Sequence, residues 1–356
     1  MRIGIVALSY AVLAVMPAQA EEVNVDNFVR AESDTMFRAN MKAMGVGVGE
    51  VHHLRMPTTP ENQPVIRMNQ DTLYTAVVLD LSEPVKIKLP EIEGRYQSMH
   101  VVNQDHYMFV EAKPGVYDLT EENVGTRFAL VTIRTFANPK DPDDLKKAHQ
   151  AQDAIKVEGG GKGPFDAPDW DQQALATGRK ALNDFAAALG FEASKAFGRK
   201  EEIEPTSFLI GAAAGWGGLP QSAAMYVIDS VAANDGDTPH KVTAKDVPVD
   251  GFWSITVYNS DGYLEANDLG VNNYNKFTAE PNDDGSIAIH LGGCGDDRVN
   301  CIPVTKGWNY AIRMYQPRAE IIDGSWTFPE IQPAERQELG FREASILREE
   351  LQTFGT

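Results

Sequence analysis

Polar side chains that could do chemistry stand on segments that otherwise have the alternation of half-buried β-strands. If segment 65–74 is extended, three of them share one face: Arg67, Asn69 and Asp71. In segment 308–315, Arg313 and Tyr315 share the face opposite the apolar one. An arginine buried there would be costly without an anionic partner. Structural arginine–aspartate pairs explain the pattern most simply, and a cleft for anion binding or acid–base chemistry is the alternative.

The cleft interpretation assigns roles to a defined set of residues. The acid–base candidates are Asp71 with His100 or His106, because a histidine titrates near neutral pH and can exchange protons with a substrate. Arginines would anchor anions or hydroxyl groups, and aromatic side chains would form stacking or hydrogen-bonding walls. The ligand-binding candidates are Arg67, Asn69, Tyr74, Arg95, Trp216, Tyr258, Arg313 and Tyr315.

Other catalytic chemistries lack their sequence motifs. The chain has no Gly-x-Ser-x-Gly elbow, no His-Glu-x-x-His pair and no dinucleotide-binding fingerprint. We therefore expect no cofactor. A metal enzyme would need three convergent ligands, and the adjacent His52 and His53 point apart on any regular element, so we assign no metal ligand.

Short strands separated by glycine, proline and aspartate must position these candidates. Segment 85–89 alternates apolar residues with lysines, and the stretch 251–263 alternates before it reaches an Asp-Gly turn. This spacing indicates antiparallel sheets or sandwiches instead of alternating βαβ units. The expected helices start after Asp26, cover 143–155 behind an Asp141-Pro142 cap, and run from Asp169 to Leu189.

Two glycine-rich stretches interrupt the periodic pattern. The run 159–163 predicts a flexible linker, since it lacks the spacing of a phosphate-binding loop. The stretch 211–220 around Trp216 is either a packed connector between domains or the rim of a binding cleft.

The N-terminus and the cysteines point to an oxidising compartment. Residues 1–20 read as a signal peptide, with Arg2, an apolar run too short to span a bilayer, and an Ala-Gln-Ala cleavage site. The two cysteines, Cys294 and Cys301, are expected to form a disulfide. We therefore expect a periplasmic or secreted protein that does not insert into a membrane once the signal is removed.

The charge balance excludes some partners. The chain carries a formal net charge of −19 at pH 7, which repels nucleic acid and anionic membrane surfaces. A small or oligomeric polar ligand is the expected partner, and the sequence leaves open whether the protein forms a homo-oligomer.

Several motifs together resemble a known pair of domains. Segments 67–74 (Arg-x-Asn-x-Asp-Thr-Leu-Tyr), 79–81 and 94–96 are similar to the core of the DUF1254 family. Segments 216–218, 252–262, 313–317 and 323–326 resemble its usual C-terminal partner, DUF1214. The resemblance identifies a two-domain family of exported bacterial proteins of unknown function. Some relatives carry esterase-like names, which the missing nucleophile elbow does not support.

The resemblance implies a mainly β fold with helical insertions. It predicts an N-terminal β-rich domain and a C-terminal antiparallel domain like a β-sandwich or jelly roll. The expected plan is a signal peptide (1–20), the N-terminal domain (21–140), a helical connector (141–205), the C-terminal domain (206–333) and a helical tail (334–356).

Two functions follow from this organisation. The first is an exported protein of unknown activity that binds a polar ligand in a polar–aromatic cleft between its domains, with hydrolysis left open. The alternative is a non-catalytic cell-envelope protein that acts through contacts with other molecules. A closed polar pocket would favour the first, and an uninterrupted apolar sheet edge the second.

Overall fold

The computed structural model describes residues 20–63, 65–295 and 298–334. The predicted signal peptide up to residue 19 and the predicted helical tail after residue 334 lie outside these residues. Within the described residues sixteen strands form four sheets, which confirms the mainly β fold with helical insertions. No helix in this part of the chain is both long and apolar enough to cross a membrane.

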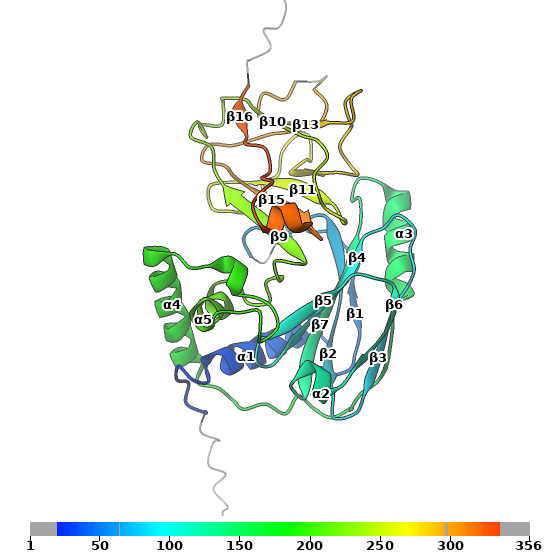
Figure 1. Ribbon diagram of the computed structural model, residues 1–356, viewed down its shortest axis with the longest axis vertical. Helices are drawn as coiled ribbons and strands as arrows, with labels where there is room; N and C mark the ends of the chain where they lie inside the picture. The colour runs from blue at the N-terminus through cyan, green and yellow to red at the C-terminus, as the bar shows by residue number, and fades with distance from the viewer. Residues whose placement is uncertain (1–19, 64, 296–297, 335–356) are drawn as a thin grey trace, which may run out of the picture.

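The N-terminal sandwich consists of a five-stranded and a three-stranded sheet (Figure 1). In spatial order, the first contains β1 (His52–Leu54), β2 (Thr72–Asp80), β7 (Phe128–Phe136), β4 (Gln97–Asn103) and β5 (Met108–Glu111). The second contains β6 (Gly115–Leu119), β3 (Val85–Leu89) and β8 (Lys156–Gly159). Apolar residues of both inner faces, such as Ile87, Val101 and Val131, form one core. Alternation sets this packing, since Lys86 and Lys88 of β3 are exposed while its apolar residues are buried.

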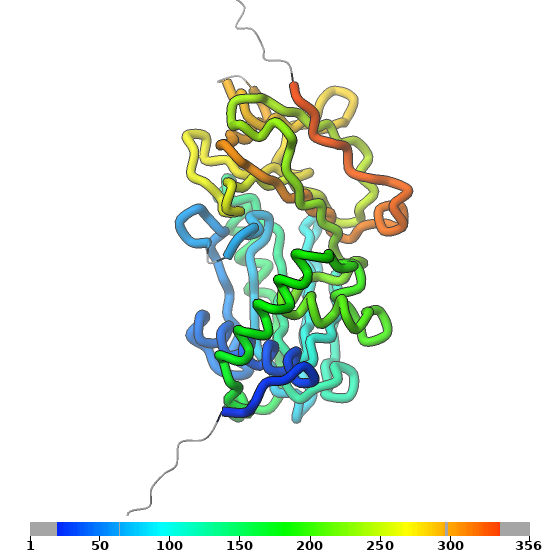
Figure 2. The backbone as a smooth tube through the Cα atoms, turned by 90° about the vertical axis from the view of Figure 1, so that its left-hand side faces the viewer, coloured from blue at the N-terminus to red at the C-terminus, as the bar shows by residue number. Residues whose placement is uncertain are grey.

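The helices α1 (Phe28–Met44), α4 (Gln172–Leu189) and α5 (Pro205–Gly215) lie at one end of the outer face of the five-stranded sheet. Further helices lie elsewhere: α2 (Glu121–Val124), α3 (Pro142–Asp153) and α6 (Ala319–Ile322). Phe37 and Met41 of α1 pack against Val78, Phe128 and Leu130, and α4 and α5 lie beside α1 (Figures 1 and 2). The predicted cap of α3 is confirmed, because the Asp141 side chain accepts hydrogen bonds from two backbone N–H groups in its first turn.

The C-terminal sandwich consists of two four-stranded sheets. One contains β12 (Asn273–Asn275), β11 (Trp253–Tyr258), β15 (Asn309–Tyr315) and β9 (Ala224–Asp229) in spatial order. The other contains β14 (Cys301–Ile302), β13 (Ile287–Leu291), β10 (His240–Ala244) and β16 (Gln332–Pro333). Trp253, Ile255 and Val257 of β11 belong to the core between the sheets. The alternate residues of β11 are therefore directed to the outer face, toward the N-terminal sandwich.

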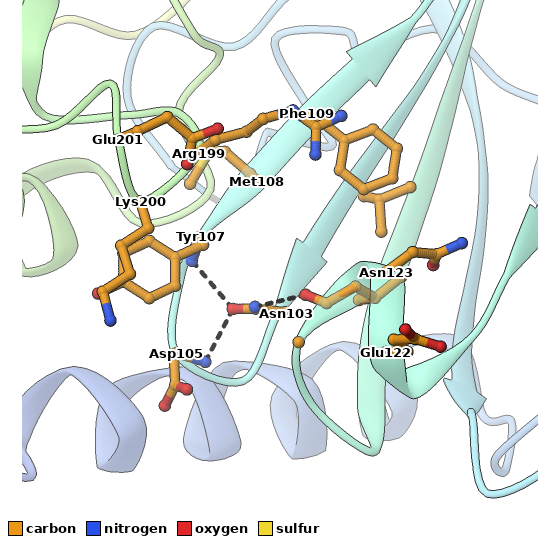
Figure 3. A pocket seen from close by; sticks show the side chains of 13 residues that line it. Asn103, Asp105, Tyr107, Met108, Phe109, Glu122, Asn123, Arg199, Lys200 and Glu201 are labelled. Atoms are coloured by element: carbon orange, nitrogen blue, oxygen red, sulfur yellow. Dashed lines mark hydrogen bonds between the residues drawn. The ribbon is translucent and has the colours of Figure 1, made fainter.

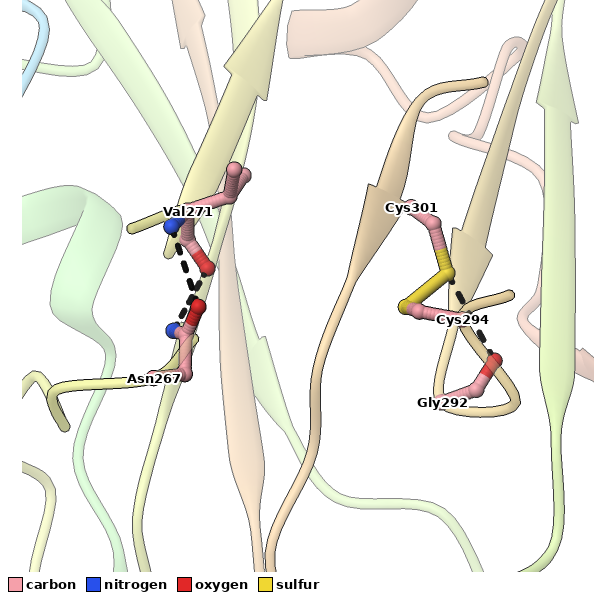
Figure 4. The surroundings of a disulfide bond; sticks show 5 residues. All are labelled: Asn267, Val271, Gly292, Cys294 and Cys301. Carbon is pink, nitrogen blue, oxygen red and sulfur yellow. Dashed lines mark hydrogen bonds between the residues drawn. A yellow bond between two sulfur atoms is a disulfide. The ribbon is translucent and has the colours of Figure 1, made fainter. Parts of the chain in front are cut away.

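The predicted disulfide between Cys294 and Cys301 is confirmed (Figure 4). The disulfide joins strand β14 to the loop that follows β13. Strands β13 and β14 pair in parallel. The bond therefore closes a short loop at one end of the C-terminal sandwich.

Candidate functional site

The two sandwiches meet at a polar junction built around the segment that precedes β2. The prediction that this segment is extended from residue 65 is wrong, because Arg67 has φ +54° and β2 begins only at Thr72. The Arg67 N–H donates to the Gly262 carbonyl over 2.8 Å, so the turn after β11 holds the segment in place. The segment consequently bends into the C-terminal sandwich instead of extending the sheet.

Asp71 is fully buried at this junction and accepts hydrogen bonds from the C-terminal sandwich. Its Oδ2 accepts from Ser254 Oγ over 2.6 Å, and Oδ1 accepts from Asn273 Nδ2 (2.6 Å) and Asn275 Nδ2 (3.0 Å). Burial raises the pKa of the Asp71 carboxyl, and the hydrogen bonds and the charge of Arg313 oppose that rise. All three side-chain partners are neutral groups, so the carboxyl acts here as a clamp between the sandwiches.

Asn69 adds a second link across the junction. Its Oδ1 accepts from the backbone N–H of Asp71 over 2.6 Å, and its Nδ2 donates to Tyr315 Oη over 3.0 Å. The amide thus fixes the bend in the segment and connects it to β15.

Arg313 is buried with its guanidinium hydrogen-bonded to uncharged oxygens. Nη1 donates to Thr256 Oγ1 over 3.0 Å, and Nη2 donates to the Arg67 carbonyl (2.8 Å) and to Tyr258 Oη (2.7 Å). Tyr258 in turn donates to the Met68 carbonyl over 2.9 Å. Three of the predicted ligand-binding residues, Arg67, Tyr258 and Arg313, therefore contact one another, and they make structural links between the sandwiches.

The structure does not bring the predicted acid–base residues together. Neither His100 nor His106 is among the hydrogen-bond partners of Asp71. His106 lies near α5, where its Nε2 accepts from the Gly217 N–H over 2.9 Å and burial lowers its pKa to about 3. Burial holds the pKa of His100 well below its ordinary value. Among the described residues Asp71 therefore makes no hydrogen bond with either histidine.

Two further predicted residues have structural contacts of their own. Arg95 forms a bidentate pair with Asp144 and donates to the Phe136 carbonyl over 2.6 Å, which ties α3 to β7. Trp216 donates to Ser33 Oγ over 3.0 Å and stacks on His106, with 5.6 Å between ring centroids. These contacts favour a packed connector over a cleft rim for Trp216, and they leave Arg95 outside the junction.

Sequence reasoning missed Arg134, which stands at the junction on the outer face of β7. In the sheet register it lies between Tyr74 of β2 and Ser98 of β4. Its guanidinium carbon is 5.5 Å from the centroid of the Tyr74 ring. The buried Nη1 of Arg134 has no hydrogen-bond partner among the described residues. The signal was present in the sequence, since an arginine in an apolar strand also singled out Arg313.

Tyrosines surround Arg134 and Arg313 from both sandwiches. Tyr226 of β9 lies opposite Arg313 in the register of the C-terminal sheet. Burial opposes the charge of Arg134, while the phenolic oxygens of its tyrosine neighbours raise its pKa. We call this group the arginine–tyrosine cluster: Tyr74, Tyr96, Arg134, Tyr226, Arg313 and Tyr315.

Hollows of the surface lie mainly away from the junction. One of about 320 Å³ lies between β5 and residues 199–201, and none of the predicted site residues lines it (Figure 3). Its lining carries charges of both signs, and Asn103 there is saturated by the N–H groups of Asp105 and Tyr107 and by the Val124 carbonyl. A smaller hollow of about 30 Å³ lies beside Tyr258, on the side of residues 265–267 and 303–305.

Metal chemistry has no preformed centre in the described part of the chain. No group of three or more histidine, cysteine, aspartate or glutamate side chains converges there. The polar groups of the junction are the carboxyl of Asp71 and guanidinium, phenol, amide and hydroxyl groups.

Comparisons with known proteins identify two domains and one shared fold. A family described as "Protein of unknown function (DUF1254)" matches residues 48–122, and one described as "Protein of unknown function (DUF1214)" matches residues 223–319. No curated protein matches the chain.

The crystal structure of the VPA0106 protein from Vibrio parahaemolyticus is 18% identical, with a TM-score of 0.67 over 87% of this chain and 98% of that one. An uncharacterized protein from Burkholderia cenocepacia is 13% identical, with a TM-score of 0.48 over 87% of each chain. The first likeness shows a shared fold alone. The two domain matches and their order place the chain in the two-domain family of unknown function that joins DUF1254 to DUF1214.

Proposed function

We propose that the protein binds a small anionic ligand at the arginine–tyrosine cluster. The observation that carries this proposal is Arg134, a cation with a buried nitrogen that has no hydrogen-bond partner among the described residues. A buried polar group without a partner costs on the order of 1–3 kcal/mol, and more when it is charged. An anion that accepts from Nη1 would remove this cost.

Other arginines of the chain support this argument by contrast. Three buried or partly buried arginines have carboxylate partners: Arg95 with Asp144, Arg127 with Asp80, and Arg179 with Glu32. Arg313 has three oxygen acceptors instead. Among the described acids none pairs with Arg134, and the groups around it are phenols. A site with a spare positive charge and several hydroxyl donors suits an oxyanion.

The ligand would approach from the side of β9. Tyr226 is 42% exposed, whereas Tyr315 on the neighbouring strand is 1% exposed. His100 contributes a second buried nitrogen without a partner, Nε2, on the same face of the five-stranded sheet. The exposed tyrosine would therefore form the entrance and Arg134 the floor. Hydrolysis of the ligand stays a prediction, since no nucleophile is assigned.

A location outside the cytoplasm agrees with this proposal. The disulfide is typical of oxidising compartments, and the predicted signal peptide would direct the chain there. We infer a periplasmic or secreted protein that meets its ligand outside the cytoplasmic membrane.

Thermal unfolding with a panel of anions tests the proposal. The panel contains sulfate, phosphate, citrate and glucuronate at constant ionic strength, with glucose as the uncharged control. We expect at least one anion to raise the Tm of the wild type, and Arg134→Gln to abolish this rise. The matched control Arg199→Gln removes an arginine beside the hollow of Figure 3 and should keep the rise. An anion effect that survives in Arg134→Gln, or no effect of any anion, would contradict the proposal.

The edge strand β9 favours a second candidate function, assembly with another copy of the chain. Tyr226, Val227 and Ile228 are 42%, 36% and 54% exposed on this edge. Exposed edge strands with β-branched residues pair readily with other strands. An antiparallel pair centred between Tyr226 and Val227 would set Asp229 opposite Ala224 of the other copy, which keeps the acids of an acidic chain apart.

Light scattering tests the assembly. We expect a dimer for the wild type and a monomer for Ile228→Lys, because a lysine on the edge blocks strand addition. Lys241→Ala, on the other C-terminal sheet, should leave the dimer intact. A wild-type protein that stays monomeric at all micromolar concentrations would exclude this candidate.

A further inference from the structure

The tyrosines of the arginine–tyrosine cluster are not equivalent. Burial raises the pKa of Tyr96 to about 12, although its Oη donates to Ser98 Oγ over 2.9 Å. Desolvation by its neighbours raises the pKa of Tyr226 although the residue is 42% exposed, and burial holds the pKa of Tyr315 well above its ordinary value. These phenols will keep their protons at any physiological pH and can serve as hydrogen-bond donors.

Tyr74 differs because it lies closest to the uncompensated charge. It faces Arg134 directly in the β2–β7 register, and the guanidinium carbon lies 5.5 Å from its ring centroid. Burial acts to raise the pKa of Tyr74, but the charge of Arg134 and hydrogen bonds from neighbouring side chains outweigh burial and lower it.

The contacts of the Tyr74 hydroxyl leave it free for proton exchange. Asn69 Nδ2 lies 3.5 Å from Tyr74 Oη, but its two hydrogens serve the closer acceptors Thr72 Oγ1 (3.1 Å) and Tyr315 Oη (3.0 Å). Among the described residues no hydrogen bond runs from Tyr74 Oη to another acceptor, which leaves the phenolic proton available. A negative charge on Oη would be stabilised by Arg134.

We propose that Tyr74 exchanges a proton with a hydroxy acid or sugar acid whose carboxylate lies against Arg134. This inference rests on the proposed anion-binding function and names the ligand class. The planar guanidinium fits a carboxylate, while phenols and Ser98 fit hydroxyl groups. The aromatic rings of the cluster provide apolar faces on which a sugar ring can pack.

The proton transfer is balanced without any further reactant. In the ionised state, Tyr74 Oη takes the proton of a ligand hydroxyl group next to the carboxylate. The O–H bond of the ligand breaks, the O–H bond of Tyr74 forms, and the negative charge moves to the ligand oxygen. Arg134 stays close to the charge in both states, and the reverse transfer restores the phenolate.

A spectroscopic titration tests Tyr74 without an activity assay. Ionised tyrosine has its own near-ultraviolet absorbance, so each variant can be titrated with base while circular dichroism verifies the fold. We expect the wild type to contain one tyrosine that ionises before the others, and Tyr74→Phe to lose that step. Tyr96→Phe removes a phenol from the same cluster and should keep the step. A Tyr74→Phe variant that keeps the early step would overturn the inference.

Ligand binding separates this inference from the proposed function. Glucuronate binding to the wild type should raise the early tyrosine ionisation by about one pH unit, because its carboxylate offsets the charge of Arg134. Glucose should leave it unchanged. One outcome is that glucuronate binds to the wild type and not to Arg134→Gln, without moving the tyrosine titration. In that case anion binding stands, but Tyr74 is not the group that exchanges the proton. If only sulfate or phosphate binds, the hydroxy-acid class is wrong. If no anion binds, the proposed function itself fails.

Discussion

Asp71 Oδ2 accepts a 2.6 Å hydrogen bond from Ser254 Oγ, a residue 183 positions later in the chain. Asp71 is 0% exposed, so this contact and its two asparagine bonds are made without competition from water. Buried polar groups at such a contact are costly to leave unpaired. The carboxyl that resembled a catalytic acid in sequence therefore stabilises the junction between the sandwiches.

Replacement of Asp71 should destabilise the fold by an amount that depends on whether the new side chain can still accept hydrogen bonds. Asp71→Ala leaves three donors without an acceptor, the buried Ser254 and Asn275 and the partly buried Asn273, and we expect a loss of about 3 kcal/mol in the free energy of unfolding. Asp71→Asn retains one oxygen for the asparagines and can donate to Ser254, so its loss should stay below about 1.5 kcal/mol. Urea unfolding measures both. Equal losses in the two variants would show that volume, and not hydrogen bonding, sets the cost.

The pair of the buried Asp80 with the partly exposed Arg127 should make the free energy of unfolding depend on pH in the acid range. Asp80 Oδ2 lies 2.8 Å from Arg127 Nη2, and this hydrogen-bonded pairing lowers the pKa of Asp80 from 3.8 to about 2. A lowered pKa in the folded state means that the stabilisation is complete above pH 3.8 and is lost as the pH falls toward 2.

We therefore expect Asp80→Asn to lower the free energy of unfolding by about 1–2 kcal/mol at pH 6, a range that allows for the partial exposure of Arg127. The difference from the wild type should shrink as the pH falls below 4. Asp118→Asn is the matched control, because its pair with Lys86 is exposed on both sides. A difference that stays constant from pH 6 to pH 2 would contradict this account.

His106 should contribute in the upper part of the acid range. Burial lowers its pKa from 6.5 to about 3, so the unfolded chain binds a proton in this window and the folded chain does not. Stability should therefore fall as the pH falls from 6.5 toward 3, by about 1.4 kcal/mol per pH unit for this group.

Replacement of the imidazole separates titration from packing. We expect His106→Asn to flatten the pH dependence of the unfolding free energy, whatever its stability at neutral pH. Trp216→Phe perturbs the ring that stacks on His106 and should lower stability without changing the slope. An unchanged slope in His106→Asn would mean that the histidine is protonated in the folded chain.

Alternation made the strands predictable, and long-range contact made the site hard to predict. Segment 85–89 matches β3 because burial of one face fixes a period of two. Helix α5 was missed because its sequence is apolar on all sides and shows no amphipathic period. The hydrogen-bond partners of Asp71 lie far from it in the sequence, and so does Tyr226 from its neighbour Arg313. No local pattern in the sequence indicates these contacts.

The glycine run 159–163 shows how composition can mislead about packing. Gly159 ends β8 and has φ +90°, and a Cβ there would lie 2.3 Å from the Pro84 carbonyl oxygen. A Cβ on Gly161 would lie 2.6 Å from side-chain oxygens of both Asp80 and Ser82. These glycines permit close approach of the backbone, so the expected flexible linker is wrong.

Gly159→Ala should accordingly lower the free energy of unfolding by more than the strain of a left-handed backbone alone. Gly45 is the matched control, because it has a left-handed backbone (φ +68°, ψ +33°) but no atom within 4 Å of the place that a Cβ would take. We expect Gly45→Ala to lower the free energy of unfolding by about 1–2 kcal/mol. Gly159→Ala should lower it by at least about 3 kcal/mol, since the added methyl group collides with backbone in addition. Similar losses in the two variants, measured by urea unfolding, would indicate that residues 159–163 move freely enough to relieve the contact.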